Sequence, residues 1–151
     1  MAVVGRACIF GRFCYNSSIM EQTQTPAAGK KILLLEDEEM LATMYKTKFE
    51  KEGMSIDVAS DGEAGLAMAQ AQPYDIILVD IIMPKLDGFA ALKRLREMPQ
   101  YKSTPIIMLT NLGQEEDIAK SKALGATDYL IKANFTPSQV LEKIQSVSLN
   151  T

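Results

Sequence analysis

From Lys30 onward, short apolar runs alternate with longer stretches in which apolar residues recur at helical spacing. The short runs are rich in Ile, Leu and Val, which favours buried β-strands. The predicted strands are Ile32–Leu35, Ser55–Ala59, Ile76–Val79, Ile106–Leu109 and Tyr129–Ile131. Regular alternation of strands and helices is typical of a parallel sheet with helices on both faces. The pattern therefore predicts an α/β fold of five β-α units.

The first two predicted helices have recognisable signals at their ends. The first spans Glu39–Glu52, and Gly53 supplies its stop. Its residues at helical spacing are Leu41, Met44, Tyr45, Lys48 and Phe49. Before the second helix, Ser60 and Glu63 have the spacing of a capping box. This helix must end by Pro73, because proline cannot continue it.

Three further helices complete the pattern. The third is expected near Phe89–Met98 and stops at Pro99, and the fourth is expected near Glu115–Leu124 and stops at Gly125. The last begins at Thr136–Gln139, which reads as a capping box. Its proline stands at the first helical position, where the missing N–H costs nothing.

Length and composition limit the function classes. The chain has 151 residues, 47% hydrophobic and 23% charged, which suits one globular domain. From the nineteen residues after Lys132 we expect one closing helix rather than an added DNA-reading module, and a net charge of −3 gives no basic surface for nucleic acid. The chain has no histidine, which excludes Ser-His-Asp triads, His-ligated zinc and a phosphohistidine carrier.

Residues 1–29 lack the alternating pattern, so we expect a disordered extension before a domain at residues 30–149. Alternatives are a peptide that docks on a partner or membrane, and a true start at Met20. The segment lacks the apolar run of about 7 residues of a signal peptide and the run of about 20 of a membrane span. Cys8 and Cys14 lie in it and are poor evidence for a disulfide framework. A cytoplasmic protein without membrane contact is therefore expected.

Polar residues stand where the predicted strands end. Glu36 and Asp37 follow the first strand, Asp80 the third, Thr110 the fourth and Lys132 the fifth. In an open parallel sheet, ligands bind just beyond these strand ends. Two carboxylates about 4 Å apart repel by roughly 4 kcal/mol at an effective dielectric of about 20, and a hard divalent cation removes that cost. The residues predict a crevice for Mg²⁺ and a phosphoryl group.

Five motifs in this order resemble the receiver domains of two-component response regulators. They are Leu35-Glu36-Asp37, Val79-Asp80-Ile81-Ile82-Met83-Pro84, Asp87-Gly88, Met108-Leu109-Thr110 and Tyr129-Leu130-Ile131-Lys132. The resemblance covers about residues 30–149. It implies a flavodoxin-like (βα)5 doubly wound parallel sheet with strand order 2-1-3-4-5, whose crevice lies between the first and third strands.

The resemblance also implies roles for the strand-end residues. Asp80 would accept a phosphoryl group from the phosphohistidine of a histidine kinase or histidine phosphotransfer protein. Mg²⁺ would be bound directly by Asp37 and Asp80, through water by Glu36, and by the backbone carbonyl of Ile82. Lys132 would bind a phosphoryl oxygen. The domain would thus be a signalling domain that catalyses only its own phosphotransfer and dephosphorylation.

Two residues are expected to change position when the phosphoryl group is present. Its charge and acceptor oxygens would attract the Thr110 hydroxyl, and Tyr129 would follow inward. The surface made by the fourth helix, the fifth strand and the fifth helix would then change. That surface would signal to an unidentified protein target, and a phosphorylation-dependent homodimer is an alternative outcome.

Three positions depart from the family pattern. Proline usually follows the lysine, joined by a cis bond, whereas this chain has Ala133. Either this bond is cis at a cost of about 3 to 4 kcal/mol, or the Lys132 loop differs. Asn111 replaces a usually small residue, and either obstructs the pocket or adds a hydrogen bond. Ile82 offers no polar side chain to orient an attacking water.

Two alternative functions use part of the same residue set. A magnesium-dependent phosphatase with an aspartyl-phosphate intermediate resembles an Asp-x-Asp pattern, in which Ile82 replaces the second acid. A receiver-like module that binds proteins without phosphorylation is favoured by Ala133 and opposed by the complete strand-end set. Flavodoxins need a phosphate-binding loop after the first strand, where this chain is acidic, and no P-loop sequence is present.

Overall fold

The computed structural model describes residues 29–150, so the predictions made for the N-terminal extension, Met20 and the two cysteines lie outside the described residues. Five parallel strands form one sheet in the order β2-β1-β3-β4-β5. The strands are β1 (Lys31–Leu35), β2 (Ser55–Ala59), β3 (Ile76–Val79), β4 (Ile106–Thr110) and β5 (Asp128–Ile131). The predicted flavodoxin-like fold class and strand order are confirmed.

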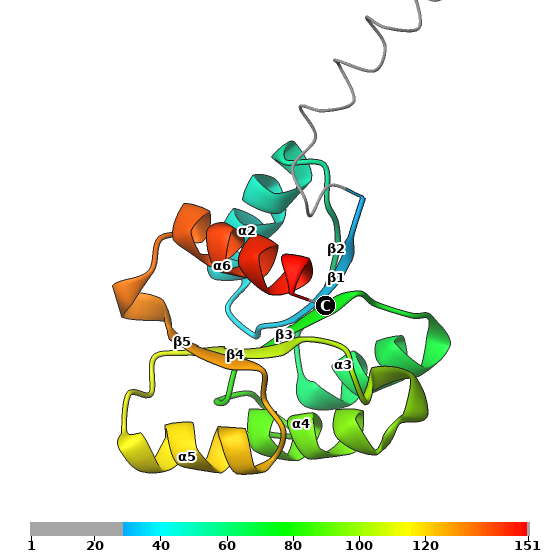
Figure 1. Cartoon of the computed structure of the whole chain (residues 1–151), viewed down its shortest axis with the longest axis vertical. Coiled ribbons are helices and arrows are strands. Elements are labelled where there is room, and N and C mark those ends of the chain that lie inside the picture. The colour runs from blue at the N-terminus through cyan, green and yellow to red at the C-terminus, as the bar shows by residue number, and fades with distance from the viewer. Residues whose placement is uncertain (1–28, 151) are drawn as a thin grey trace, which may run out of the picture.

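Helices cover both faces of the sheet. They are α2 (Glu39–Lys51), α3 (Gly62–Ala71), α4 (Gly88–Glu97), α5 (Glu115–Ala123) and α6 (Pro137–Leu149), with short 3-10 helices η1 (Pro99–Tyr101) and η2 (Lys132–Asn134). Figure 1 shows α2 and α6 on one face and α3, α4 and α5 on the other. This doubly wound arrangement leaves the carboxyl ends of the strands uncovered as a site for ligands.

The sheet separates two hydrophobic cores. In β1, Ile32 and Leu34 face the core under α2 and α6, whereas Leu33 and Leu35 face the core under α3 and α4. The central strands β3 and β4 alternate in the same way. Strands buried on both faces need apolar side chains at every position. This is why the strands appear in the sequence as uninterrupted apolar runs.

The buried stripe of α2 differs in part from the prediction. The structure buries Ala42, Tyr45 and Phe49, which lie on one side of the helix. Met44, predicted on this stripe, is 47% exposed. The small side chain of Ala42 allows close packing on the sheet, so the stripe runs through positions 42, 45 and 49 rather than through 44 and 48.

The predicted Ser60–Glu63 capping box is wrong. The N-cap of α3 is Asp61, whose Oδ1 accepts a hydrogen bond from the backbone N–H of Ala64 at 2.8 Å. An N-cap must directly precede the first helical residue, and α3 begins at Gly62. At the last helix, the predicted capping box is present, with both Thr136–Gln139 hydrogen bonds formed.

Candidate functional site

Parallel pairing brings the acidic residues of two neighbouring strands together. The last paired residues of β1 and β3 are Leu35 and Val79, and Glu36 and Asp80 directly follow them. The backbone N–H of Asp80 donates to the carbonyl of Leu35 at 3.0 Å, and that of Glu36 donates to the carbonyl of Ala59 at 2.9 Å. These bonds extend the sheet by one residue and fix both acidic residues at its carboxyl edge.

Three carboxylates meet at this edge. One oxygen from each of Glu36, Asp37 and Asp80 lies within 4.8 Å of the other two. Glu36 and Asp80 are buried, whereas Asp37 is exposed. Oxygen ligands of this kind suit a hard divalent cation such as Mg²⁺, which keeps several waters when proteins bind it. The donor set therefore fits such an ion, with Asp37 on the side open to solvent.

Lys132 neutralises part of this cluster. Its Nζ lies 2.8 Å from Oδ2 of Asp80 and also pairs with Oε2 of Glu36, and its side chain is only 8% exposed. Burial alone would lower the pKa of Lys132, but the hydrogen bonds and charges of Asp80 and Glu36 outweigh it and raise the pKa above its ordinary value. The ammonium form is thereby favoured at the strand ends.

Glu36 has both of its carboxylate oxygens engaged. Oε2 pairs with Lys132, and Oε1 accepts a hydrogen bond from the backbone N–H of Glu38 at 3.1 Å. Burial raises the pKa of Glu36, against the opposing effect of Lys132. The Asp37 side chain is exposed at the solvent side of the cluster, so it is the better placed of the two for direct contact with an incoming cation.

The Lys132–Ala133 peptide bond is trans, as are all peptide bonds within residues 29–150. Of the two alternatives for this bond, the different loop is the one observed: Lys132 to Asn134 form the 3-10 helix η2. The lysine side chain nevertheless reaches Asp80. Proline at position 133 is thus not needed to bring the ammonium into the crevice.

The two predicted switch residues lie on β4, which pairs with β3, and on β5, which pairs with β4. Thr110 ends β4 and is buried, and its Oγ1 accepts a hydrogen bond from the backbone N–H of Leu112 at 3.4 Å. Tyr129 in β5 is half-buried, and its hydroxyl donates to the carbonyl of Leu112 at 2.7 Å. Both side chains therefore contact the loop between β4 and α5. Asn111, in the same loop, is exposed.

The loop from Asp80 to Gly88 leads from the acidic cluster to α4. Oδ1 of Asp80 accepts a hydrogen bond from the N–H of Ile81 at 2.7 Å, and the side chain of Ile82 is 63% exposed. A Cβ at Gly88 would lie 2.1 Å from the carbonyl oxygen of Asp80, so glycine is required by space.

One ion pair between this loop and the start of α3 was not predicted. Lys85 in the loop pairs with Asp61 at the start of α3, with 3.3 Å between Nζ and Oδ2. The pair joins segments that are distant in the sequence. The Asp61-Gly62 dipeptide before an Ala-rich helix is the signal that identifies Asp61 as a cap, but no sequence pattern indicates its second contact.

The fold and site define a class of protein: a flavodoxin-like parallel sheet with an acidic cluster and a lysine at its carboxyl edge. The family model described as the response regulator receiver domain matches residues 32–145. The chain therefore belongs to the receiver domains of two-component response regulators, which are signalling domains. The resemblance inferred from the five motifs is confirmed.

Curated relatives share this domain as part of longer proteins. The chain is 38% identical over 119 residues to the alkaline phosphatase synthesis transcriptional regulatory protein PhoP of Bacillus subtilis, covering 79% of this chain and 48% of that protein. It is 34% identical over 123 residues to the transcriptional regulatory protein SrrA of Staphylococcus aureus, covering 82% and 49%. The chain thus spans about half the length of these relatives.

Solved structures match over nearly their whole length. The chemotaxis protein CheY4 of Vibrio cholerae is 37% identical with a TM-score of 0.75, covering 80% of this chain and 99% of that chain. The receiver domain of the Francisella response regulator 1452 is 34% identical with a TM-score of 0.74, covering 81% and 98%. Among residues 29–150, no helix has the length and apolar character to cross a membrane.

Proposed function

We propose that this receiver domain accepts a phosphoryl group on Asp80 from the phosphohistidine of a histidine kinase or histidine phosphotransfer protein. The observation that carries the proposal is the contact of the Lys132 ammonium with the carboxylates of Asp80 and Glu36, 2.8 Å from the former, at the open edge of the sheet. A phosphoryl group joined to Asp80 would find this cation beside its oxygens.

In the transfer, a carboxylate oxygen of Asp80 forms a bond to phosphorus as the phosphorus–nitrogen bond of the phosphohistidine breaks. The electron pair of the broken bond remains on the imidazole nitrogen of the partner. Lys132 stabilises the negative charge on the phosphoryl oxygens during this step. Because these 151 residues contain no histidine, the donor histidine lies outside them.

Magnesium is the cofactor that the acidic cluster supports best. Asp37 and Asp80 would bind it directly, and the Ile82 backbone carbonyl would add a third protein oxygen. Glu36, whose two oxygens already have partners, would act through water. When bound, the ion supplies positive charge to the phosphoryl oxygens and offsets the repulsion among the carboxylates.

The output would pass through Thr110 and Tyr129. Phosphorylation of Asp80 would draw the Thr110 hydroxyl away from the Leu112 N–H and release Tyr129 from the carbonyl of the same residue, since both contacts lie in one loop. This rearrangement would change the surface formed by α5, β5 and α6. The recipient would be a protein of the cytoplasm, or a second copy of this domain. The domain itself would catalyse only its own phosphotransfer and dephosphorylation.

The test is the intact mass of the protein after incubation with a small phosphodonor and Mg²⁺. The native protein should gain the mass of one phosphoryl group, and Asp80→Asn should gain none while keeping its circular dichroism spectrum. Glu38→Gln, which removes a nearby exposed carboxylate, is the matched control and should be labelled like the native protein. Full labelling of Asp80→Asn would exclude Asp80 as the acceptor.

A further inference from the structure

An unusual backbone conformation lies close to the acidic cluster. Within residues 29–150, Lys85 is the one residue other than glycine with a positive φ, at 65°. The N–H of Leu86 donates to the carbonyl of Pro84 at 2.8 Å, so residues 84–86 form a γ-turn, which is rare and strained in this form. Such conformations persist where surrounding contacts hold them, and they concentrate at functional sites.

Two contacts hold this γ-turn against the start of α3. The first is the ion pair between Lys85 and Asp61, at 3.3 Å. The Asp61 carboxylate is 9% exposed and serves both elements, since Oδ2 faces Lys85 while Oδ1 caps α3 through the Ala64 N–H. The second is close backbone packing: a Cβ at Gly62 would lie 2.3 Å from the carbonyl oxygen of Leu86.

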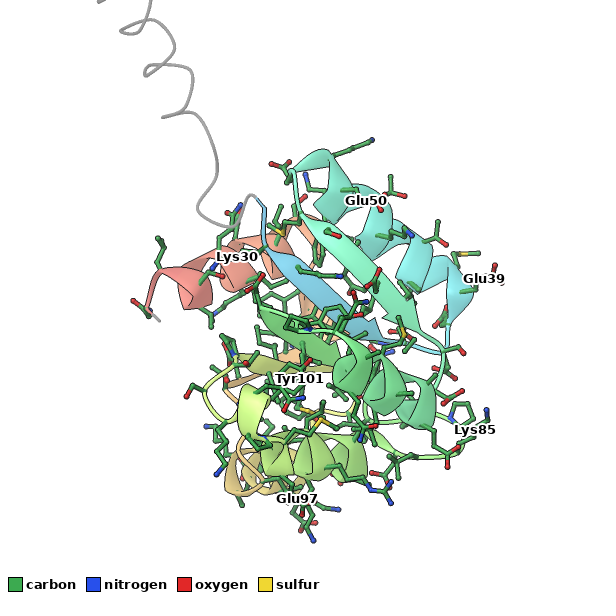
Figure 2. The ribbon with its side chains drawn as sticks, turned by 90° about the vertical axis from the view of Figure 1, so that its right-hand side faces the viewer. Lys30, Glu39, Glu50, Lys85, Glu97 and Tyr101 are labelled. Carbon is green, nitrogen blue, oxygen red and sulfur yellow. The ribbon has the colours of Figure 1, made fainter. Side chains whose placement is uncertain are left out.

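The γ-turn is linked to the site by the same loop. The N–H of Gly88 donates to the carbonyl of Ile81 at 2.8 Å, which closes the loop immediately after Asp80. Gly88 also packs directly on the carbonyl of Asp80. Figure 2 shows Lys85 at the same end of the molecule as Glu39, the first residue of α2. A displacement of the γ-turn would therefore move the backbone that carries Ile82.

We infer that Asp61 is a positioning residue for the magnesium site: its carboxylate holds Lys85, and through the γ-turn it holds the backbone of Ile82 beside Asp80. The inference rests on the proposed function, because it takes Asp37 and Asp80 as the ligands of the ion. Asp61 itself contacts neither the ion nor the phosphoryl group. It acts on the loop between β3 and α4, which packs against the start of α3.

Two substitutions isolate this contact. Asp61→Asn keeps an oxygen for the Ala64 N–H and removes the charge that faces Lys85, and Lys85→Met removes the ammonium. In a calorimetric titration with magnesium chloride alone, each should weaken Mg²⁺ affinity about two- to fivefold, the size expected for an ion pair with one exposed partner. The double variant should bind Mg²⁺ as tightly as the single variant that has the lower affinity, because both substitutions remove the same interaction.

Amide NMR spectra of the magnesium-free proteins give a second readout. Both variants should shift the signals of Ile82 and Leu86 while leaving α6 unchanged. Lys93→Met, which removes an exposed lysine from α4, is the matched control for net charge and should bind Mg²⁺ like the native protein. Asp37→Ala is the positive control for loss of the metal.

The outcomes separate the inference from the function on which it rests. If the native protein binds Mg²⁺, Asp37→Ala does not, and both Asp61→Asn and Lys85→Met retain native affinity, the inference is overturned and the proposed function stands. A lower melting temperature with native Mg²⁺ affinity would assign Asp61 a structural role and overturn it equally. If the native protein binds no Mg²⁺, the proposed function itself fails.

Discussion

At the scale of single residues, the balance of charge explains why the site would need an ion. Glu36, Asp37 and Asp80 contribute three carboxylates, and Lys132 contributes one ammonium within hydrogen-bonding distance of two of them. In their ionised forms these groups leave two negative charges, which one divalent cation neutralises. A phosphoryl group would then add new negative charge where both cations are close enough to offset it.

Ile82 should slow the loss of the phosphoryl group. Its side chain is apolar and 63% exposed, so it cannot orient the water that would attack phosphorus. Ile82→Asn supplies an amide at this position, and we expect dephosphorylation about tenfold faster, a modest share of the ~10²–10⁴ that a positioned polar group contributes. The measurement is the decay of the phosphorylated mass with time.

Ile82→Val, which keeps an apolar branched side chain, is the control and should decay like the native protein. An unchanged or slower decay in Ile82→Asn would show that this side chain does not limit hydrolysis. Asn111 would then be the next residue to test, since it lies exposed in the loop after Thr110.

The sequence predicted which residues stand at the strand ends, because parallel strands place their carboxyl ends at one edge. It did not predict that Asp61 contacts Lys85. That contact depends on how tightly Gly62 packs against Leu86, which is a property of two loops meeting in space. The sequence also did not predict whether the Lys132–Ala133 peptide bond is cis or trans, since both alternatives were compatible with the residues present.

At the scale of elements, helix ends were predicted with uneven success. Thr136 and Gln139 form the expected capping box because both side chains are free to bond each other's backbone. Ser60 failed as a cap because α3 begins one residue later, after Asp61. The difference lies in tertiary packing: the start of α3 is fixed against Leu86, whereas the start of α6 is set by its own side chains.

The capping box of α6 should contribute measurably to stability. Thr136→Ala removes the oxygen that accepts the Gln139 N–H at 3.3 Å, and we expect a loss of about 1 kcal/mol in the free energy of unfolding. The melting temperature should fall by about 4 °C.

Thr136→Ser restores the hydroxyl and should recover most of this loss. Ser138→Ala changes a neighbouring exposed residue and serves as the matched control. If Thr136→Ala melts together with the native protein, the hydroxyl adds nothing beyond the proline at the first helical position.

At the scale of the whole molecule, tyrosines are packed on both sides of the sheet. Tyr45 belongs to the core under α2 and α6, while Tyr74 and Tyr101 belong to the core under α3 and α4. Burial is the first cause that raises the pKa of each phenol. For Tyr74, burial and the hydrogen bond to Asp57 raise the pKa to about 12. Each neutral hydroxyl is therefore favoured by the folded state.

These shifts predict alkaline instability with a defined sign. The unfolded chain releases its phenolic protons near pH 10, whereas the folded chain holds those of Tyr45, Tyr74, Tyr101 and Tyr129 to higher pH. The contribution of these tyrosines to the free energy of unfolding should therefore be constant below pH ~10 and fall as pH rises toward about 12.

Urea titrations at increasing pH, combined with tyrosinate absorbance, measure this dependence. Tyr74→Phe should remove the latest step of the absorbance titration. Ionisation of all tyrosines near pH 10 while the circular dichroism spectrum stays native would contradict the prediction.

The sheet order was available from the sequence because five spaced motifs resemble one family. The apolar runs alone establish parallel strands covered on both faces, but they do not order them: the runs of β1, β3 and β4 are similarly apolar, and the crossover that places β1 between β2 and β3 depends on packing across the whole chain. Likewise, contacts between the helix and the sheet, rather than helical spacing, determine that Ala42 is buried and Met44 is exposed.

The pairing of Lys132 with Glu36 and Asp80 joins positions 96 and 52 residues apart, and this separation bears on how the molecule is made. Closing long loops costs entropy, so contacts between nearby segments tend to form first. A chain growing from its N-terminus would hold the acidic residues of β1 and β3 before the strand bearing their ammonium had emerged. The last strand to dock both completes the sheet and neutralises that cluster, so an unfinished chain lacks the cation on which phosphoryl transfer to Asp80 would depend.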